Sequence, residues 1–136
     1  MTIPLGIRSN NPGNLRPGIF PWRGQEKVEN NYCIFDTPFN GIRAMAKQLL
    51  VYQNKHGCRT IWKIVSRWAP PHDNNDVQAY VDDVCKRIKK NQYEVLNLKD
   101  KILLRDLVTA MIFHENGQQP YAAAIIAAAV DDALKG

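Results

Sequence analysis

The stretch TPFNGIRAMAKQLLVYQNKHG, residues 37–57, predicts one long helix near the centre of the chain. It begins with Thr37 and Pro38, a typical N-cap and first helical residue, and it ends at Gly57, a typical C-terminal stop. Between these signals the apolar residues recur at helical spacing: Ile42, Met45, Ala46, Leu49, Leu50 and Tyr52. The centre of the chain is therefore expected to be helical.

Three further helices are bounded by similar signals downstream. Thr60 can cap a short helix that Pro70 must terminate, because proline cannot continue a helix. The polar cluster at residues 73–76 offers caps for the next helix. Asp100 opens a third one, which Gly117 is expected to end.

The two ends of the chain differ in character. Pro120 begins a final helix over residues 121–134, which are rich in alanine, the best helix former. Residues 1–36 are instead rich in Gly, Pro and Asn around short aromatic runs, which predicts loops and a small β-hairpin. We therefore expect a mainly α fold of the α+β type, with about five helices and an N-terminal hairpin, in one domain over residues 1–136.

The net charge of +5, from 18 Lys and Arg against 13 Asp and Glu, draws the chain toward polyanions. Nucleic acid and the bacterial envelope both qualify. The densest basic cluster, residues 86–90, ends a predicted helix, where cations suit the helix dipole. Because the sequence lacks both a recognition helix and the aromatic-basic interleaving of single-strand binders, we expect no nucleic-acid partner.

Cysteine and histidine usage gives no sign of a disulfide framework, metal site or cofactor. The cysteines are odd in number, widely separated and without CxxC spacing, and the histidines show no metal-ligand spacing. The chain begins without the features of a secretory signal, and its apolar runs are too short to cross a membrane. We therefore expect a monomer without a signal peptide, metal, cofactor or membrane span.

Glu115 is the residue best placed for acid catalysis. It follows an apolar run near the end of a predicted helix and precedes Gly117, so its carboxyl is expected to be partly desolvated. Desolvation raises the pKa of a carboxyl group and lets it hold a proton for a leaving oxygen near neutral pH. A helix-end glutamate that is simply exposed is the more common arrangement, and position alone leaves both interpretations open.

Two groups of residues could bind a sugar substrate. The side chains of an amide-rich turn can bind hydroxyl and N-acetyl groups, although the same pattern is typical of a structural Asx-turn: Asn10, Asn11, Asn14 and Arg16. Aromatic side chains could form platforms for sugar rings: Trp22, Trp68, Tyr80 and Tyr121. Trp68 and Tyr80 lie at helical spacing, where most aromatic residues belong to the core.

Several of these segments resemble a known phage family. GIRSNNPGNLR at residues 6–16 and RWAPP at residues 67–71 resemble a family of phage virion structural or lytic proteins. The chain is similar, along nearly its whole length, to the lysin carried by some double-stranded-RNA phages. This resemblance implies a bacteriolytic, phage-type protein.

A second resemblance concerns the lysozyme superfamily. Bacterial wall glucosaminidases and lytic transglycosylases have an apolar helix ending in Glu-Ser-Gly, followed by an Asn-Asn-Phe-Gly turn and a β-element. Here MIFHENG at residues 111–117 is similar to that helix and NNPG at residues 10–13 to that turn, in reversed order, as in a circular permutation. Asn116 stands where these enzymes have a small residue. The resemblance implies that Glu115 lies in space beside Asn11 and Trp22.

Together the two resemblances imply a lysozyme-like enzyme that cleaves the glycan strands of peptidoglycan. Glu115 would be the general acid and base, with Glu29 as first candidate and Glu26 as second candidate for an opposing carboxylate. Without a second carboxylate, the muramic 6-hydroxyl would attack and give an anhydro product, the outcome that we favour. Cleavage of the stem peptides and a non-catalytic virion or wall-binding module remain alternatives.

This interpretation also implies where the protein acts. It would be made in the host cytoplasm or carried in a virion, and it would act on the bacterial cell wall. Access to the wall would then depend on virion proteins or on a holin.

Overall fold

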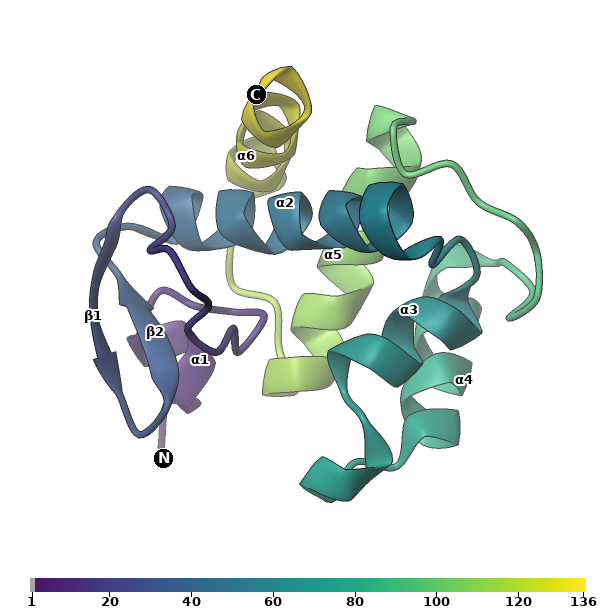
Figure 1. Ribbon diagram of the computed structural model, residues 1–136, viewed down its shortest axis with the longest axis horizontal. Helices are drawn as coiled ribbons and strands as arrows, with labels where there is room; N and C mark the ends of the chain where they lie inside the picture. The colour runs from purple at the N-terminus through teal and green to yellow at the C-terminus, as the bar shows by residue number, and fades with distance from the viewer. Residues whose placement is uncertain (1) are drawn as a thin grey trace.

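The computed structural model describes residues 2–136 and is mainly helical, with one small hairpin (Figure 1). In chain order the elements are α1 (Leu5–Arg8), β1 (Gln25–Glu29), β2 (Tyr32–Phe35), α2 (Pro38–His56), α3 (Ile61–Trp68), a single 3₁₀ turn (Pro71–Asp73), α4 (Val77–Ile88), α5 (Lys101–Asn116) and α6 (Ala123–Lys135). The expected mainly α fold with a small N-terminal β-element is confirmed.

The long central helix α2 has the ends that its sequence predicts. The side chain of Thr37 accepts a hydrogen bond from the backbone N–H of Asn40 at 3.2 Å, and Pro38 occupies the first turn. At the other end Gly57 adopts a left-handed conformation with φ of 64°. This conformation costs glycine little, so the helix stops there.

Side-chain caps also begin the next three helices. Thr60 caps α3 through the N–H of Lys63, and Asp76 caps α4 through the N–H of Ala79. Asp100 caps α5 by accepting from two backbone N–H groups, and Gly117 ends α5 with φ of 69°. These boundaries are the ones predicted from Thr60, the 73–76 cluster, Asp100 and Gly117.

Two helical boundaries differ from the expectation. The one-turn helix α1 lies in a region expected to form loops, because a single turn is too short to show helical periodicity. Helix α6 begins at Ala123 instead of Pro120, since the backbone N–H of Tyr121 bonds to the side chain of Gln119 in a local turn. Ala122 precedes α6 and provides no side-chain cap.

The hairpin pairs Glu29 with Tyr32 across a two-residue turn. Both turn residues, Asn30 and Asn31, have positive φ, at 50° and 65°, as the tightest hairpin turns require. The β2 side chains Cys33 and Phe35 point into a small core, together with Leu15 and the α2 residue Ala44. The hairpin is thereby fixed to the start of α2.

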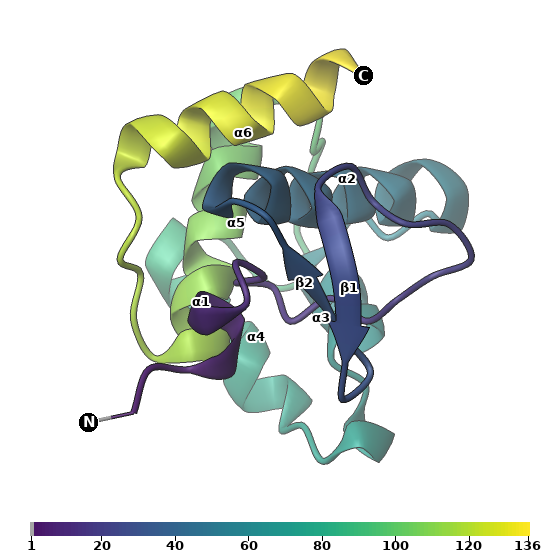
Figure 2. The same ribbon diagram turned by 90° about the vertical axis from the view of Figure 1, so that its left-hand side faces the viewer.

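A second and larger core joins the helices. Buried residues of α2, α5 and α6 pack together with those of α3 and α4, and α6 crosses α2 (Figures 1 and 2). The last turn of α5 lies between the N-terminal segment and α4, with contacts to both α1 and α4 (Figure 1). Among residues 2–136, no helix combines the length and the apolar character needed to cross a membrane.

Candidate functional site

Glu115 lies half-buried in the last turn of α5, and both of its carboxyl oxygens are hydrogen-bonded. The side-chain amide of Asn14 donates to Oε1 at 2.8 Å, and the hydroxyl of Tyr80 donates to Oε2 at 2.8 Å. Burial raises the pKa of the Glu115 carboxyl above its ordinary value, and the hydrogen bonds from Asn14 and Tyr80 only partly oppose this effect. The side chain is therefore biased toward holding a proton, in a fixed orientation.

The amide-rich turn places Asn14 beside Glu115. Asn11 is only 1% exposed, and its side chain bonds to the backbone N–H and C=O of Leu15 and to the C=O of Cys33. Asn14 itself has φ of 53°, a left-handed conformation that asparagine tolerates better than most residues. The turn is thus tied to β2 from within, and Asn14 projects from it.

Asn116 joins this turn directly to α5. Its side-chain NH₂ donates to the carbonyl of Pro12 at 2.8 Å, a contact between residues 104 positions apart. Gly6 of α1 lies against the same side chain, and a Cβ at this position would lie 2.6 Å from Oδ1 of Asn116 and 2.9 Å from the carbonyl oxygen of Asn11. Both distances are too short for a real contact, so α1, the turn and α5 can pack this closely only with glycine at position 6.

Tyr80 is supported from its other side by His114, which in turn contacts Asp83. Its ring lies 4.0 Å from the His114 ring, centroid to centroid, and His114 Nδ1 contacts Asp83 Oδ2 at 2.8 Å. Although burial acts to raise it, the pKa of Asp83 is lowered by hydrogen bonds from His114 and Arg87. Burial also raises the pKa of Tyr80 well above its ordinary value, and the nearby Glu115 carboxyl adds to the shift, so the phenol remains a donor.

Three adjoining hollows form a groove that passes Glu115, which we call the Glu115 groove. The first, of about 220 Å³, is lined by Tyr80, His114 and Asn75 as well as by Glu115. The second, of about 110 Å³, shares Glu115 and Asn75 with the first. The third, of about 280 Å³, shares five residues with the second: Gly13, Asn14, Arg16, Trp68 and Asp73.

The wall of the groove on the α3 side is formed by Trp68. Its indole N–H donates to the carbonyl of Gly13 at 3.2 Å, which holds the ring against the amide-rich turn. A Cβ on Gly13 would lie 2.9 Å from the Trp68 ring, so the tight contact requires glycine at this position. Trp68 also packs edge-on against Tyr52, at 5.8 Å between ring centroids. An aromatic surface thus lines the groove next to the Glu115 carboxyl.

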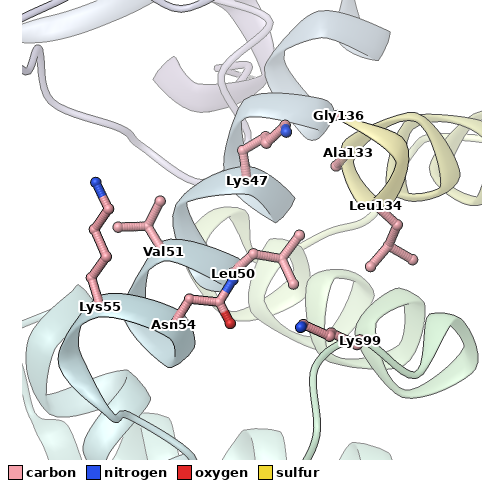
Figure 3. Close-up of a pocket in the computed structure, with 9 residues that line it drawn as sticks. All are labelled: Lys47, Leu50, Val51, Asn54, Lys55, Lys99, Ala133, Leu134 and Gly136. Atoms are coloured by element: carbon pink, nitrogen blue, oxygen red, sulfur yellow. The ribbon is translucent and has the colours of Figure 1, made fainter.

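A larger hollow of about 490 Å³ lies elsewhere, between α2 and the end of α6 (Figure 3). Its lining shares no residue with the Glu115 groove and contains lysine, amide and aliphatic side chains, such as those of Lys47, Asn54 and Leu134. No Asp or Glu lines it, so it offers no carboxylic acid for proton transfer. Within residues 2–136, no three His, Cys, Asp or Glu side chains gather closely enough to hold a metal ion.

The chain is similar in sequence to a known bacteriophage protein. No family model matches the chain. The chain is 36% identical over 123 residues to Protein P5 of Pseudoalteromonas phage PM2, a match that covers 85% of this chain and 73% of that protein. The chain belongs to the Protein P5 family. It is therefore a protein of bacteriophage type.

In this member of the Protein P5 family, four of the residues expected to bind substrate line the groove near Glu115. They are Asn14, Arg16, Trp68 and Tyr80. The amide-rich turn does lie beside Glu115, but the contact is made by Asn14, whereas Asn11 is buried beneath it. Asn10 likewise bonds inward, from its side-chain NH₂ to the carbonyl of Phe35.

The other residues of this chain that were expected to bind substrate or to act in catalysis lie outside the groove lining. Trp22 packs against the small core below the hairpin, and Tyr121 packs against the main core. Glu29 is exposed at the end of β1, where it pairs with Lys27 at 2.9 Å, and Glu26 is exposed on the same strand. None of these four residues lines any of the three hollows that form the groove.

Sequence reasoning missed several groove residues. The sequence marks Asp73 and Asn75 only as possible helix caps and His114 only as a histidine without metal-ligand spacing, yet all three line the groove. Local sequence carried no signal for these positions, because they reach the groove through the loop between α3 and α4 and through the packing of α4 on α5.

Proposed function

We propose that this protein cleaves the glycan strands of peptidoglycan, with Glu115 as general acid and then base. One observation carries the proposal: a half-buried carboxyl with a raised pKa is held by Asn14 and Tyr80 inside a groove with an aromatic wall. Such a carboxyl can remain protonated until a glycosidic oxygen needs its proton. The phage relative supports the bacteriophage part of this proposal.

The hydrogen bonds leave room for this chemistry. Each carboxyl oxygen has two lone-pair directions, and Asn14 and Tyr80 occupy one on each oxygen. A proton carried on a remaining position faces the groove and can pass to the oxygen between N-acetylmuramic acid and N-acetylglucosamine. The carboxylate that forms is then stabilised by the two donors already in place. Trp68 offers an apolar face against which a sugar ring can stack.

For the second half of the reaction we favour attack by the muramic 6-hydroxyl, which forms an anhydro product. Glu115 is the one groove carboxyl, among residues 2–136, that is both half-buried and hydrogen-bonded on each oxygen. Asp73 lines the same small hollow but is exposed, and its Oδ1 lies 3.9 Å from Nε2 of His72. If Asp73 activates a water instead, the products carry reducing ends.

The test uses purified peptidoglycan sacculi and the Glu115→Gln variant. Glutamine can accept the Asn14 hydrogen bond with its oxygen and donate its NH₂ to the Tyr80 hydroxyl, so the variant should fold normally. We expect wild-type protein to clear the sacculi and Glu115→Gln to lose at least about 100-fold in rate. Asp106→Asn, which removes an exposed carboxylate from the same helix, is the matched control and should retain full activity.

Product analysis separates the remaining possibilities. In mass spectra, anhydro ends are one water lighter than reducing ends, so transglycosylation and hydrolysis are distinguished directly. Release of peptides with intact glycan strands would instead indicate an endopeptidase. Binding to sacculi without any cleavage by the wild-type protein would indicate a non-catalytic wall-binding module and would refute the proposal.

A further inference from the structure

The two ends of the Glu115 groove differ in charge. The hollow beyond Trp68 is lined by two arginines, Arg16 and Arg67, and by the uncharged Gln48 and Tyr52. The hollow on the Tyr80 side carries no arginine or lysine in its lining, and Asp76 contributes a carboxylate there. Asp73 also lines the arginine hollow, so two cations face one carboxylate there and the formal charge remains positive, whereas the Asp76 side carries no cation.

Each arginine of this end is held by an aromatic ring. The guanidinium carbon of Arg16 lies 5.2 Å from the centre of the Tyr32 ring, and that of Arg67 lies 5.3 Å from the centre of the Tyr52 ring. Stacking of this kind occupies the flat face of a guanidinium and leaves its edge N–H groups available. Those edges match the geometry of a carboxylate, which they can bind through two parallel hydrogen bonds.

Neither arginine has a carboxylate partner within the described chain. The ion pairs that arginines form there involve Arg23, Arg43, Arg87 and Arg105. Arg67 instead contacts His56 Nε2 at 3.2 Å. Asp73 also lines this hollow, but it pairs with neither arginine, and its Oδ1 lies 3.9 Å from Nε2 of His72. Two exposed, ring-held guanidinium groups thus face the hollow with their charge uncompensated by any salt bridge.

We propose that this end of the groove, which we call the arginine arm, binds carboxylates of the peptide stem that peptidoglycan carries on its muramoyl residues. The proposal rests on the proposed function and adds a substrate class: strands that bear acidic peptides, in preference to bare glycan. It also gives the substrate a direction. The peptide-bearing sugar lies on the Trp68 side of Glu115, because Asp76 repels the peptide carboxylates from the other side.

The test measures binding apart from catalysis. In the inactive Glu115→Gln background, affinity is measured for soluble glycan strands with intact stems and for strands stripped of their stems by an amidase. Amidase cleavage exposes a lactyl carboxylate on each muramoyl residue, so these carboxylates are converted to neutral methylamides before binding is measured. We expect intact strands to bind about tenfold or more tightly than stripped strands, as charge-assisted hydrogen bonds allow. Adding Arg16→Gln and Arg67→Gln should lower the affinity for intact strands to that for stripped strands.

A charge-matched control separates specific contacts from general attraction. Lys63→Gln with Lys86→Gln removes two exposed positive charges from α3 and α4, which are not part of the groove lining. This variant should keep the preference for intact strands. Equal affinity for intact and stripped strands would overturn the arginine arm, and so would a loss of preference in the lysine variant as large as that in the arginine variant. Neither result would affect the proposed glycan cleavage by the wild-type protein. Preference for intact strands without any cleavage instead leaves the arm in place and refutes the enzymatic proposal.

Discussion

Replacing Asn116 by alanine should destabilise the protein and also impair the candidate site. The Asn116 side chain is the donor to the Pro12 carbonyl, at 2.8 Å, and Pro12 is buried. The same NH₂ group also donates to the carbonyl of Ile112 at 3.0 Å, but Ile112 lies within α5, so its carbonyl also belongs to the hydrogen bonding of the helix. The substitution therefore leaves one buried carbonyl without its partner, which costs about 1–3 kcal/mol. The Oδ1 atom of Asn116 is itself buried without a partner, so its removal offsets part of this cost.

The expected consequence is a lower melting temperature together with a loss of activity. For a domain of this size, about 1–3 kcal/mol corresponds to a decrease in Tm of about 4–12 °C. Because the same contact sets the position of the turn that carries Asn14, glycan cleavage should fall at temperatures where the variant is still folded. Calorimetry measures the first effect, and turnover of sacculi at 15–20 °C below the variant's Tm, roughly the region where unfolding is negligible, measures the second.

Asn54→Ala is the control, since Asn54 is an exposed residue of α2 and alanine favours helix. A Tm for Asn116→Ala within about 1 °C of the wild type would refute the reasoning. It would mean that the contact between turn and α5 contributes nothing to stability and that other packing holds the two segments together.

Three further predictions concern the scaffold and the proton on Glu115. Gly41→Ala should lower the free energy of unfolding by about 3 kcal/mol or abolish folding. The added Cβ would lie 1.7 Å from the carbonyl oxygen of Asn10, so the two backbones would have to separate. Urea unfolding measures the loss. Tyr80→Phe removes a hydrogen bond that stabilises the charged carboxylate of Glu115, so the pKa of Glu115 should rise further and the basic limb of the pH-activity profile should move to higher pH. An unchanged or downward-shifted limb would contradict that role for Tyr80. The raised pKa of Glu115 also predicts how stability depends on pH. The protonated carboxyl stabilises the wild-type fold fully at pH values below 4.5, the ordinary pKa of the group, and this contribution is lost as the pH rises through the pKa of the folded state. In Glu115→Gln this part of the pH dependence of the unfolding free energy should disappear.

Most helices of this protein could be predicted from sequence because their signals act over a few residues. Thr37, Thr60 and Asp100 each bond to backbone N–H groups two or three positions away, so the cap and the residues it serves are visible together in the chain. Gly57 and Gly117 end their helices through their own conformation. The start of α6 was harder to predict, since Ala122 provides no side-chain cap to mark it.

The sequence by itself also singled out Glu115, through its place after an apolar run, but it could not decide whether that carboxyl is exposed or held. The answer depends on Asn14, which is 101 positions away, and on Tyr80, which is 35 positions away. Their meeting requires the N-terminal turn to pack on α5 and α4 to pack on the same helix, and packing between distant segments leaves no local pattern in the chain. The same physics explains Asn11, whose amide suggested a ligand-binding group but serves the backbone of its own turn and of β2. Local hydrogen bonding thus determined the helices, and long-range packing alone decided which polar groups face one another.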